Sequence, residues 1–429
     1  MLNRKTVNTL LMRVALPALI IALSLPVSLL PAHAGTWGGT EVVEEGVKHI
    51  KNPHEPMNPM QTVKLNELWR LGGESDDPDQ MFGLISRIIS DKDGNIYLLD
   101  TQLSEIKVFS PEGEFLRTIG REGEGPGEFR TPTGIFFTPE GDLGVLQLAP
   151  GKIVLLTPEG DPAGEYPLPP SEDGGFLVLR NGQSRNNNLV LSISKNKFSE
   201  GRFDQTQYLC SLNPDGTEKA RYHEETLTLD FADAVMDDSE WNNFNNRWTV
   251  SNDGRVFAAP TYDKYAIHVW NPDGSFDRIV EREYTPQKRT PEEIELVTSI
   301  LQVFIRQVPN GKIKVHDYNS NVEQIHTRSD GSMWVLSSEG SRDKPDGAIG
   351  VFDLFDKAGK FVTQVALIGE GDPTVDGYYF VGDRLYVVTD LLQASLTLQS
   401  GGQPFDIGDE EPEPMSVICY EIGKNVDLK

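Results

Sequence analysis

The chain contains very little cysteine. Only Cys210 and Cys419 occur among its 429 residues, and each stands inside a short apolar stretch typical of a strand. The repeat pattern described below places them in units on opposite sides of the molecule, beyond the Cα separation of roughly 7 Å that a disulfide can bridge. We therefore expect two buried free thiols and a fold that depends on a large hydrophobic core.

Basic residues are also few. Lysine and arginine number 39 against 65 aspartate and glutamate residues, which gives a formal net charge of −26. Nucleic-acid binding needs a basic surface, so this balance excludes nucleic acid as the expected partner. An acidic exported surface accounts for the charge, and calcium or a cationic partner is compatible with it.

Long hydrophobic runs are absent apart from Val14–Leu30, which is interrupted by two prolines and falls short of the roughly 20 residues that span a membrane. Basic residues precede this run, and the small-residue motif Ala32–Ala34 follows it. The pattern predicts a signal peptide over residues 1–34 with cleavage near Ala34. We expect a periplasmic or secreted protein without stable membrane insertion, and residues 35–60, rich in Glu, Pro and Asn, as a flexible leader.

Glycine turns, in contrast, occur at regular intervals. Asp93-Gly94 and Glu112-Gly113 each separate two apolar runs, and both turns recur 47 residues later at Glu140-Gly141 and Glu159-Gly160. Glycine supplies the positive φ that a tight hairpin requires. Each unit is therefore predicted to contain two hairpins, each made of two strands and a tight turn, with a longer loop between the hairpins.

Four less regular units follow, with turns at 181–182 and 214–216, at 252–254 and 272–274, at 329–331 and 358–359, and at 382–383. The sixth unit lacks a last strand, which the isolated apolar segment Thr62–Leu71 can supply. The predicted fold is all-β: a six-bladed β-propeller of four-stranded blades over residues 61–425, with its ring closed by an N-terminal strand.

The motifs GREGEGPGEFRTPTGI at 120–135 and PEGDLGVL at 139–146 resemble the NHL-repeat signature. The chain is thus similar to the six-bladed NHL-like or TolB-like propellers common among exported bacterial proteins. Blades one and two match this pattern well, and blades three and six match it poorly. The resemblance implies the fold but no single function, because such propellers include binding modules and a few enzymes.

The blades differ in the spacing between their two turns, which measures the middle loop. The spacing is 19 residues in blades one and two, 20 in blade four, 28 in blade five and 34 in blade three. These loops and the largest insertion, residues 286–321 between blades four and five, belong to one face, here called the loop face; the tight turns form the opposite turn face. Within the insertion, Thr290–Glu293 reads as a capping box that begins a helix ending near Arg306.

A ligand site is expected at the mouth of the central channel on the loop face, where second strands end and first strands begin. Mixed charges and aromatic rings there suit a small polar ligand or a peptide. The alternative is an ordinary rim whose side chains close turns. The predicted ligand-binding residues are Asp100, Arg130, Arg247, Trp248, Tyr262, Asp263, Glu323 and His326.

No catalytic residue, cofactor or metal ligand set can be assigned. The sequence has no Gly-x-Ser-x-Gly motif, and its histidines do not recur at one place in successive blades. We predict a monomeric scaffold that binds a small polar ligand, protein or peptide, in preference to an enzyme. The alternatives are a metal-dependent lyase or hydrolase (lactonase-like) at the same mouth, using calcium or zinc, and a structural envelope module with an apolar patch.

Overall fold

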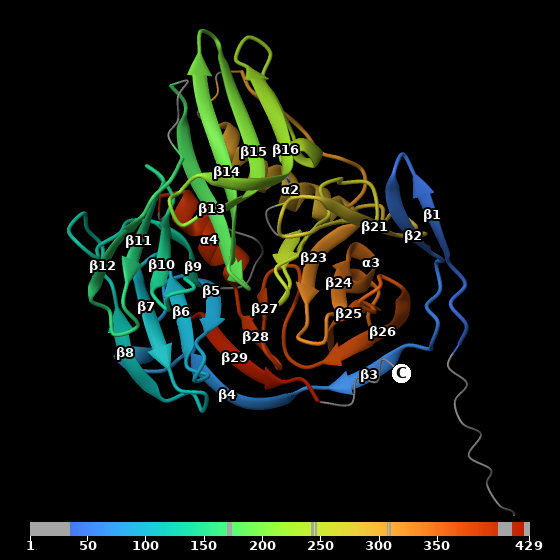
Figure 1. Cartoon of the computed structure of the whole chain (residues 1–429), viewed down its shortest axis with the longest axis horizontal. Coiled ribbons are helices and arrows are strands. Elements are labelled where there is room, and N and C mark those ends of the chain that lie inside the picture. Colours follow the sequence, from blue (N-terminus) through green and yellow to red (C-terminus); the bar gives the residue numbers. More distant parts are fainter. Residues whose placement is uncertain are drawn as a thin grey trace, which may run out of the picture. The chain divides into compact units, whose positions relative to one another are not determined.

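The computed structural model describes residues 35–169, 174–241, 244, 247–306, 308, 310–401 and 414–423. The predicted signal peptide, residues 1–34, lies outside this part of the chain. Four-stranded antiparallel sheets follow one another around a common centre, and the first strand of each lies innermost (Figure 1). The described residues therefore form a six-bladed β-propeller, as the sequence predicts.

Blade one consists of β5 (Ile85–Ser90), β6 (Ile96–Asp100), β7 (Glu105–Phe109) and β8 (Phe115–Ile119). Blade two consists of β9 (Pro132–Phe137), β10 (Leu143–Gln147), β11 (Lys152–Leu156) and β12 (Pro162–Tyr166). Blade three consists of β13 (Phe176–Arg185), β14 (Asn188–Ser199), β15 (Arg202–Leu212) and β16 (Glu218–Asp230). Second strands such as β6 and β10 are buried along their whole length, because each blade packs against a neighbour on both faces.

Blade four consists of β18 (Trp248–Val250), β19 (Val256–Ala258), β20 (Ala266–Trp270) and β21 (Phe276–Arg282). Blade five consists of β23 (Val322–Thr327), β24 (Met333–Ser337), β25 (Ala348–Phe355) and β26 (Phe361–Ile368). Blade six consists of β27 (Gly377–Val381), β28 (Arg384–Val388), β29 (Ser416–Glu421) and the N-terminal strand β4 (Asn66–Gly72). Because β4 pairs with β29, placing Arg70 opposite Ile418, the predicted closure of the ring is confirmed.

The N-terminal segment differs from the expectation of a flexible leader followed by one strand. Residues 35–60 contain β1 (Thr40–Glu44) and β2 (Val47–Asn52), a hairpin that joins the outer edge of blade four because β2 lies parallel to β21. The expected strand at 62–71 is divided, since β3 (Gln61–Lys64) lies parallel to β26 of blade five before β4 enters blade six. Pairing to open sheet edges orders a segment that has no strong apolar pattern of its own.

Buried contacts hold this leader in place. Ile50 is fully buried, and the Asn52 side chain donates to the carbonyl oxygens of Glu281 and Gly359, at 2.9 Å each. The Asn52 amide oxygen also accepts the Phe361 N–H at 2.8 Å. One asparagine thus ties the hairpin to blades four and five.

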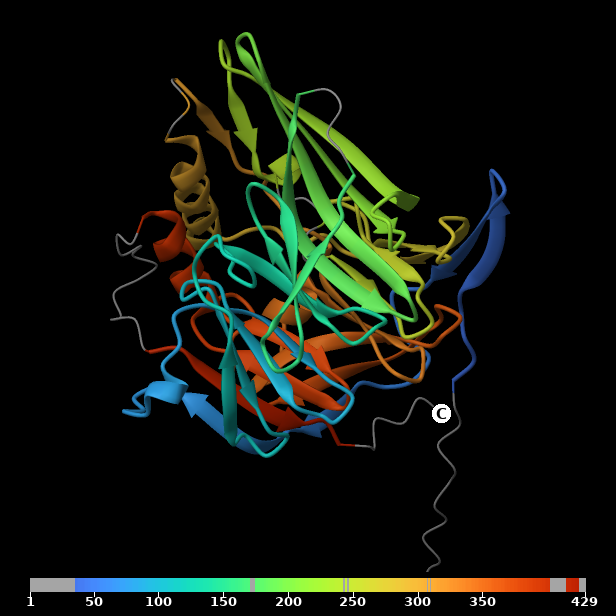
Figure 2. The same ribbon diagram turned by 60° about the vertical axis from the view of Figure 1, so that its left-hand side comes forward.

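Blade three also departs from the sequence interpretation. Asn181-Gly182, expected as its first turn, lies in the middle of β13, and the chain turns instead at Asn186 and Asn187, which both have positive φ. The large spacing to the second turn reflects strands of up to 13 residues joined by a tight turn, not a long loop. These strands extend beyond the other blades (Figures 1 and 2).

Short helices occupy the loop face. The helices are α1 (Asp238–Trp241), α2 (Pro291–Ile305), α3 (Ser338–Arg342) and α4 (Leu391–Gln399), with a 3-10 turn η1 (Pro78–Gln80) and a parallel pair of β17 (Val235–Asp237) and β22 (Lys312–Lys314). The predicted capping box is confirmed at α2, where the Thr290 hydroxyl accepts the Glu293 N–H and the Glu293 carboxylate accepts the Thr290 N–H. Among the described helices, none is long and apolar enough to cross a membrane.

The two cysteines are buried and free, as the sequence predicts. Burial raises the pKa of the Cys210 thiol to about 12 and that of Cys419 to about 11. Thiolates are the reactive form, so both cysteines behave as small apolar core residues.

Candidate functional site

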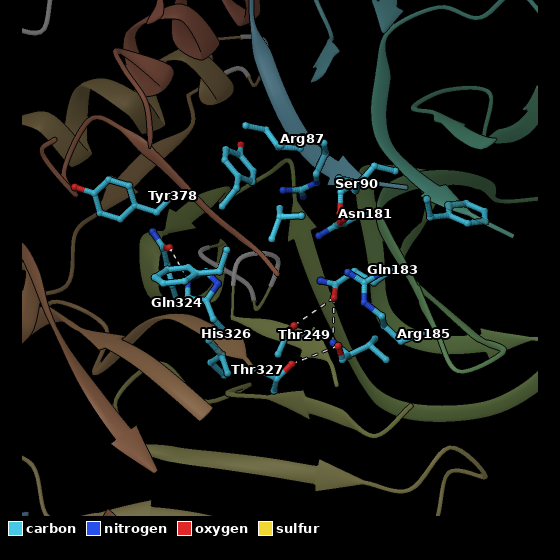
Figure 3. A pocket seen from close by; sticks show the side chains of 18 of the residues that line it. Arg87, Ser90, Asn181, Gln183, Arg185, Thr249, Gln324, His326, Thr327 and Tyr378 are labelled. Carbon is cyan, nitrogen blue, oxygen red and sulfur yellow. Dashed lines mark hydrogen bonds between the residues drawn. The ribbon is translucent and has the colours of Figure 1, made fainter. Parts of the chain in front are cut away.

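The first strands of all six blades line a central cavity of about 400 Å³, here called the channel cavity (Figure 3). Its lining runs from Ser90, Arg185 and Ser329 near the turn face to Pro373 and Leu391 at the loop-face end. Leu391 is the first residue of α4, so α4 contributes to the loop-face wall of the cavity. The cavity therefore belongs to the inner part of the ring more than to the loop-face rim that the sequence indicated.

Hydrogen bonds between first strands fix the wall of the cavity. Gln183 of β13 accepts the Val250 N–H of β18 at 3.0 Å and the Thr249 hydroxyl at 3.3 Å, and the Thr327 hydroxyl of β23 donates to the Val250 carbonyl at 3.4 Å (Figure 3). Tyr379 of β27 donates to the Ser86 carbonyl of β5 at 2.9 Å. These bonds cross from blade to blade, so the cavity is formed before any ligand arrives.

Arg87 is one of the two arginines among the described residues that line the channel cavity. It lies on β5 and lines the cavity, and burial lowers the pKa of its guanidinium, which the neighbouring Tyr379 hydroxyl partly opposes. Among the described residues Arg87 has no ion-pair partner, and its Nε makes no hydrogen bond. A buried cation without a carboxylate is costly unless something else compensates it.

The remaining charges of the cavity do not neutralise Arg87. Arg185 adds a second cation near the turn face. Asp376 is the one carboxylate among the described lining residues, and its oxygens accept the N–H groups of Asp372 and Asp390. Burial raises the pKa of Asp376, which further weakens it as a counter-charge. The cavity thus carries an excess of positive charge inside a strongly acidic protein.

Aromatic side chains form another part of the wall. His326 packs on Phe380 with ring centroids 4.3 Å apart, and burial lowers the pKa of His326 to about 3, so the imidazole is neutral at physiological pH. Trp248 is 3% exposed, lines the cavity, and has an indole Nε1–H without a hydrogen-bond partner in the described structure. Trp248 Nε1 in blade four and Arg87 Nε in blade one are therefore buried donors without a partner among the described residues.

A second cavity of about 770 Å³, here called the interblade cleft, lies between blades three and four. Arg247, Tyr262 and Asp263 line it, although the sequence analysis placed them at the channel mouth together with Trp248 and His326. Arg247 and Trp248 are neighbours in the chain, yet one lines the cleft and the other the channel cavity. Successive residues of an extended chain point to opposite faces, which separates the two side chains.

The other three predicted site residues line neither cavity. The buried Asp100 carboxylate accepts the N–H groups of Gly83, Leu84, Gln102 and Leu103, so it closes the end of β6 as the turn interpretation proposed. This set of bonds uses both of its oxygens.

Arg130 and Glu323 also lie outside the lining of both cavities. Arg130 is more than half exposed and pairs with Glu124 at 2.7 Å. Glu323 lies at a bulge of β23, where burial raises the pKa of its carboxyl to about 7.

Sequence reasoning missed Arg87, Asn181 and Gln183. Asn181 was taken as part of a turn, and Gln183 fell outside the expected first strand for that reason. The sequence could have indicated Arg87, because it is the one charged residue in the apolar run Leu84–Ile89. Within the described residues, no group of three or more His, Cys, Asp or Glu side chains is placed to hold a metal ion.

Comparison with known proteins agrees with this fold. Residues 77–231 match the family model DUF5128, described as a 6-bladed beta-propeller, and this range covers blades one to three. No curated protein matches the sequence.

Solved structures with a similar fold share little sequence with the chain. A DUF4221-family member from Bacteroides vulgatus is 12% identical, with a TM-score of 0.48 over 84% of this chain and 98% of that one. A Bacteroides fragilis protein provisionally described as exported is 13% identical, with a TM-score of 0.47 over 86% and 100%. Regucalcin, a calcium-binding protein from Agrobacterium tumefaciens, is 10% identical, with a TM-score of 0.43 over 85% and 97%. Similarities at this level describe the fold alone.

Proposed function

We propose that this chain, a six-bladed β-propeller, is an exported binding protein whose channel cavity holds a small anionic ligand. The export proposal rests on the signal-peptide pattern of residues 1–34. The ligand proposal rests on one observation above all: Arg87, whose Nε is unpaired, lies at the wall of a cavity with excess positive charge. An anion with several oxygen atoms would supply the missing acceptors.

The rest of the wall suits such a ligand. Asn181 and Gln183 bring amides, and Ser90 and Thr249 bring hydroxyls, to the same part of the cavity (Figure 3). A volume of about 400 Å³ falls in the range of small-molecule sites, which is roughly 300–1,000 Å³. The cavity walls are preformed, so binding would cost little ordering of the protein.

Titration calorimetry with citrate, glutarate and phosphate tests this proposal. We expect at least one of these anions to bind the purified protein, and Arg87→Gln to weaken that binding by at least about tenfold, because it removes a charged hydrogen-bond donor. Arg121→Gln serves as a matched control, since Arg121 is exposed and pairs with Glu128 outside the cavity.

Folding and binding can be separated in the same experiment. Removal of an uncompensated buried cation should leave the Arg87→Gln variant melting at or above the wild-type temperature. A wild-type protein that binds none of the three anions, or an Arg87→Gln variant that binds them as tightly as wild type, would contradict the proposal.

The metal-dependent lyase or hydrolase considered from the sequence stays a prediction, and so do the monomeric state and the protein or peptide partner. No contact among the described side chains favours one of these over the others.

A further inference from the structure

The interblade cleft has one wall made by blade three and an opposite wall made by blade four. β15 and β16 supply the first wall, and Arg247, His268 and the loop at Tyr262 supply the second. The strands of blade three extend beyond the other blades (Figures 1 and 2), and residues of α1 and His316 also line the cleft. It is separate from the channel cavity, with which it shares no lining residue.

A chain of buried amides lies on the blade-three wall. The Gln205 amide donates to the Asn196 amide oxygen at 3.2 Å, and the Gln207 amide donates to the Gln205 amide oxygen at 2.6 Å. All three side chains are at most 7% exposed. The chain ends at the Gln207 Oε1 atom, which accepts no hydrogen bond from any described residue. Most faces between blades are apolar, so a run of buried amides that leaves an acceptor unpaired needs an explanation.

The direction of this chain fixes what Gln207 can bind. Because its NH₂ group already donates to Gln205, Gln207 presents its oxygen at the end of the chain, and it lines the cleft. A buried acceptor without a donor destabilises the folded protein. A ligand hydroxyl would remove that cost.

The opposite wall is rigid. Arg289 donates to the Asp238 carboxylate at 2.7 Å and to the Tyr262 hydroxyl at 2.8 Å, and Asp238 also accepts the His316 backbone N–H. The rings of Tyr262 and His316 meet edge to face, with centroids 5.4 Å apart. Aromatic surface is therefore held in place beside the polar groups of blade three.

The cleft carries more negative than positive charge, because three carboxylates line it, those of Glu225, Glu240 and Asp263, against the one guanidinium of Arg247 among the described lining residues. The buried Arg247 guanidinium lies 5.9 Å from the Tyr262 ring centroid, and Glu225 is the neighbouring carboxylate. Burial lowers the pKa of His268 to about 4, so that ring is neutral at physiological pH. The walls therefore offer more hydrogen-bond acceptors than donors, which suits a ligand rich in hydroxyl groups and disfavours an anion.

We propose that the interblade cleft is a second binding site, for a short neutral saccharide. A hydroxyl both donates and accepts, so a sugar can pair with the Gln207 oxygen and with the Glu225 carboxylate. The volume of about 770 Å³ lies in the small-molecule range of roughly 300–1,000 Å³. This site is independent of the anion proposed for the channel cavity.

Calorimetry of the full protein with maltotriose, cellotriose and N,N′-diacetylchitobiose tests the proposal. We expect binding of at least one saccharide, and Gln207→Leu to weaken it by at least about tenfold because the acceptor is lost. Gln102→Leu is the matched control, since Gln102 is exposed and lines neither cavity. It should bind the saccharide as wild type does.

Two further measurements distinguish a binding role of Gln207 from a structural one. Because Gln207→Leu also removes the donor to the buried Gln205 oxygen, it should melt somewhat below wild type, but its response to anions at the channel cavity should not change. Absence of saccharide binding by the wild-type protein, or equal binding by wild type and Gln207→Leu, would overturn the proposal without affecting the one for the channel.

Discussion

The two faces of this ring are built from the same six blades, yet they differ in kind. The turn face consists of short hairpin turns, and glycine occupies a positive-φ position in most of them, as at Gly94, Gly113 and Gly141. The loop face carries α1 to α4, the insertion between blades four and five, and the extended end of blade three. Repetition therefore defines the ring on one side, whereas departures from repetition create the interblade cleft on the other.

The largest loss of stability is expected when a buried ion pair of the loop face is broken. Arg289→Ala leaves the Asp238 carboxylate, which is 4% exposed, without its cation, and this should cost about 3–5 kcal/mol in the free energy of unfolding. Urea denaturation measures the loss. Lys312→Ala is the control on the same insertion, because its pair with Asp233 is exposed, and it should unfold like wild type. Equal stability of both variants would show that the insertion adds nothing to the ring.

Two glycine variants test whether the closing strand β4 restrains the turns of the turn face. Gly113 and Gly141 both have positive φ, at 86° and 99°, so alanine at either position should cost about 1–2 kcal/mol. A Cβ at Gly113 would also approach Trp69 of β4 to 2.9 Å, whereas the space around Gly141 is open. Gly113→Ala should therefore lose more stability than Gly141→Ala in urea. Equal losses would mean that the closing strand does not restrain the turns.

A smaller, pH-dependent change in stability is expected from Glu323, at the loop-face end of β23. The Glu323 carboxyl has a pKa raised from 4.5 to about 7 by burial, so between these values the folded protein keeps a proton that the unfolded chain has released. Stability should fall as the pH rises through this window. Glu323→Gln stays neutral and should gain on the order of 1 kcal/mol over wild type at pH 8 relative to pH 4. Parallel urea midpoints at the two pH values would contradict this assignment.

The fold could be predicted wherever local signals and tertiary structure agree. Glycine turns that recur at 94, 113, 141 and 160 mark strands whose ends the structure confirms. The prediction of a turn at Asn181-Gly182 was wrong. This dipeptide has the composition of a turn, but it lies within β13 and lines the channel cavity. The hairpin of β1 and β2 was missed because its order comes from pairing with β21, which no local pattern reveals.

The candidate site was less predictable than the fold. Position at a strand end suggested Asp100, but the structure shows that its carboxylate is used by four backbone N–H groups. The features that carry both proposals, unpaired groups on Arg87 and Gln207, arise from which neighbours other blades provide. A sequence states the donors and acceptors of each side chain, but only the assembled ring shows which of them lack partners.

The N-terminal segment has a consequence for the time course of folding. Its strands β2, β3 and β4 lie along the outer edges of blades four, five and six in succession, and β4 meets a partner near residue 418. Strand β4 can therefore pair only once residues 416–421 are available, and contacts so distant in sequence slow folding. The same arrangement should delay unfolding once the ring is complete, because one end of the chain then restrains half of the blades.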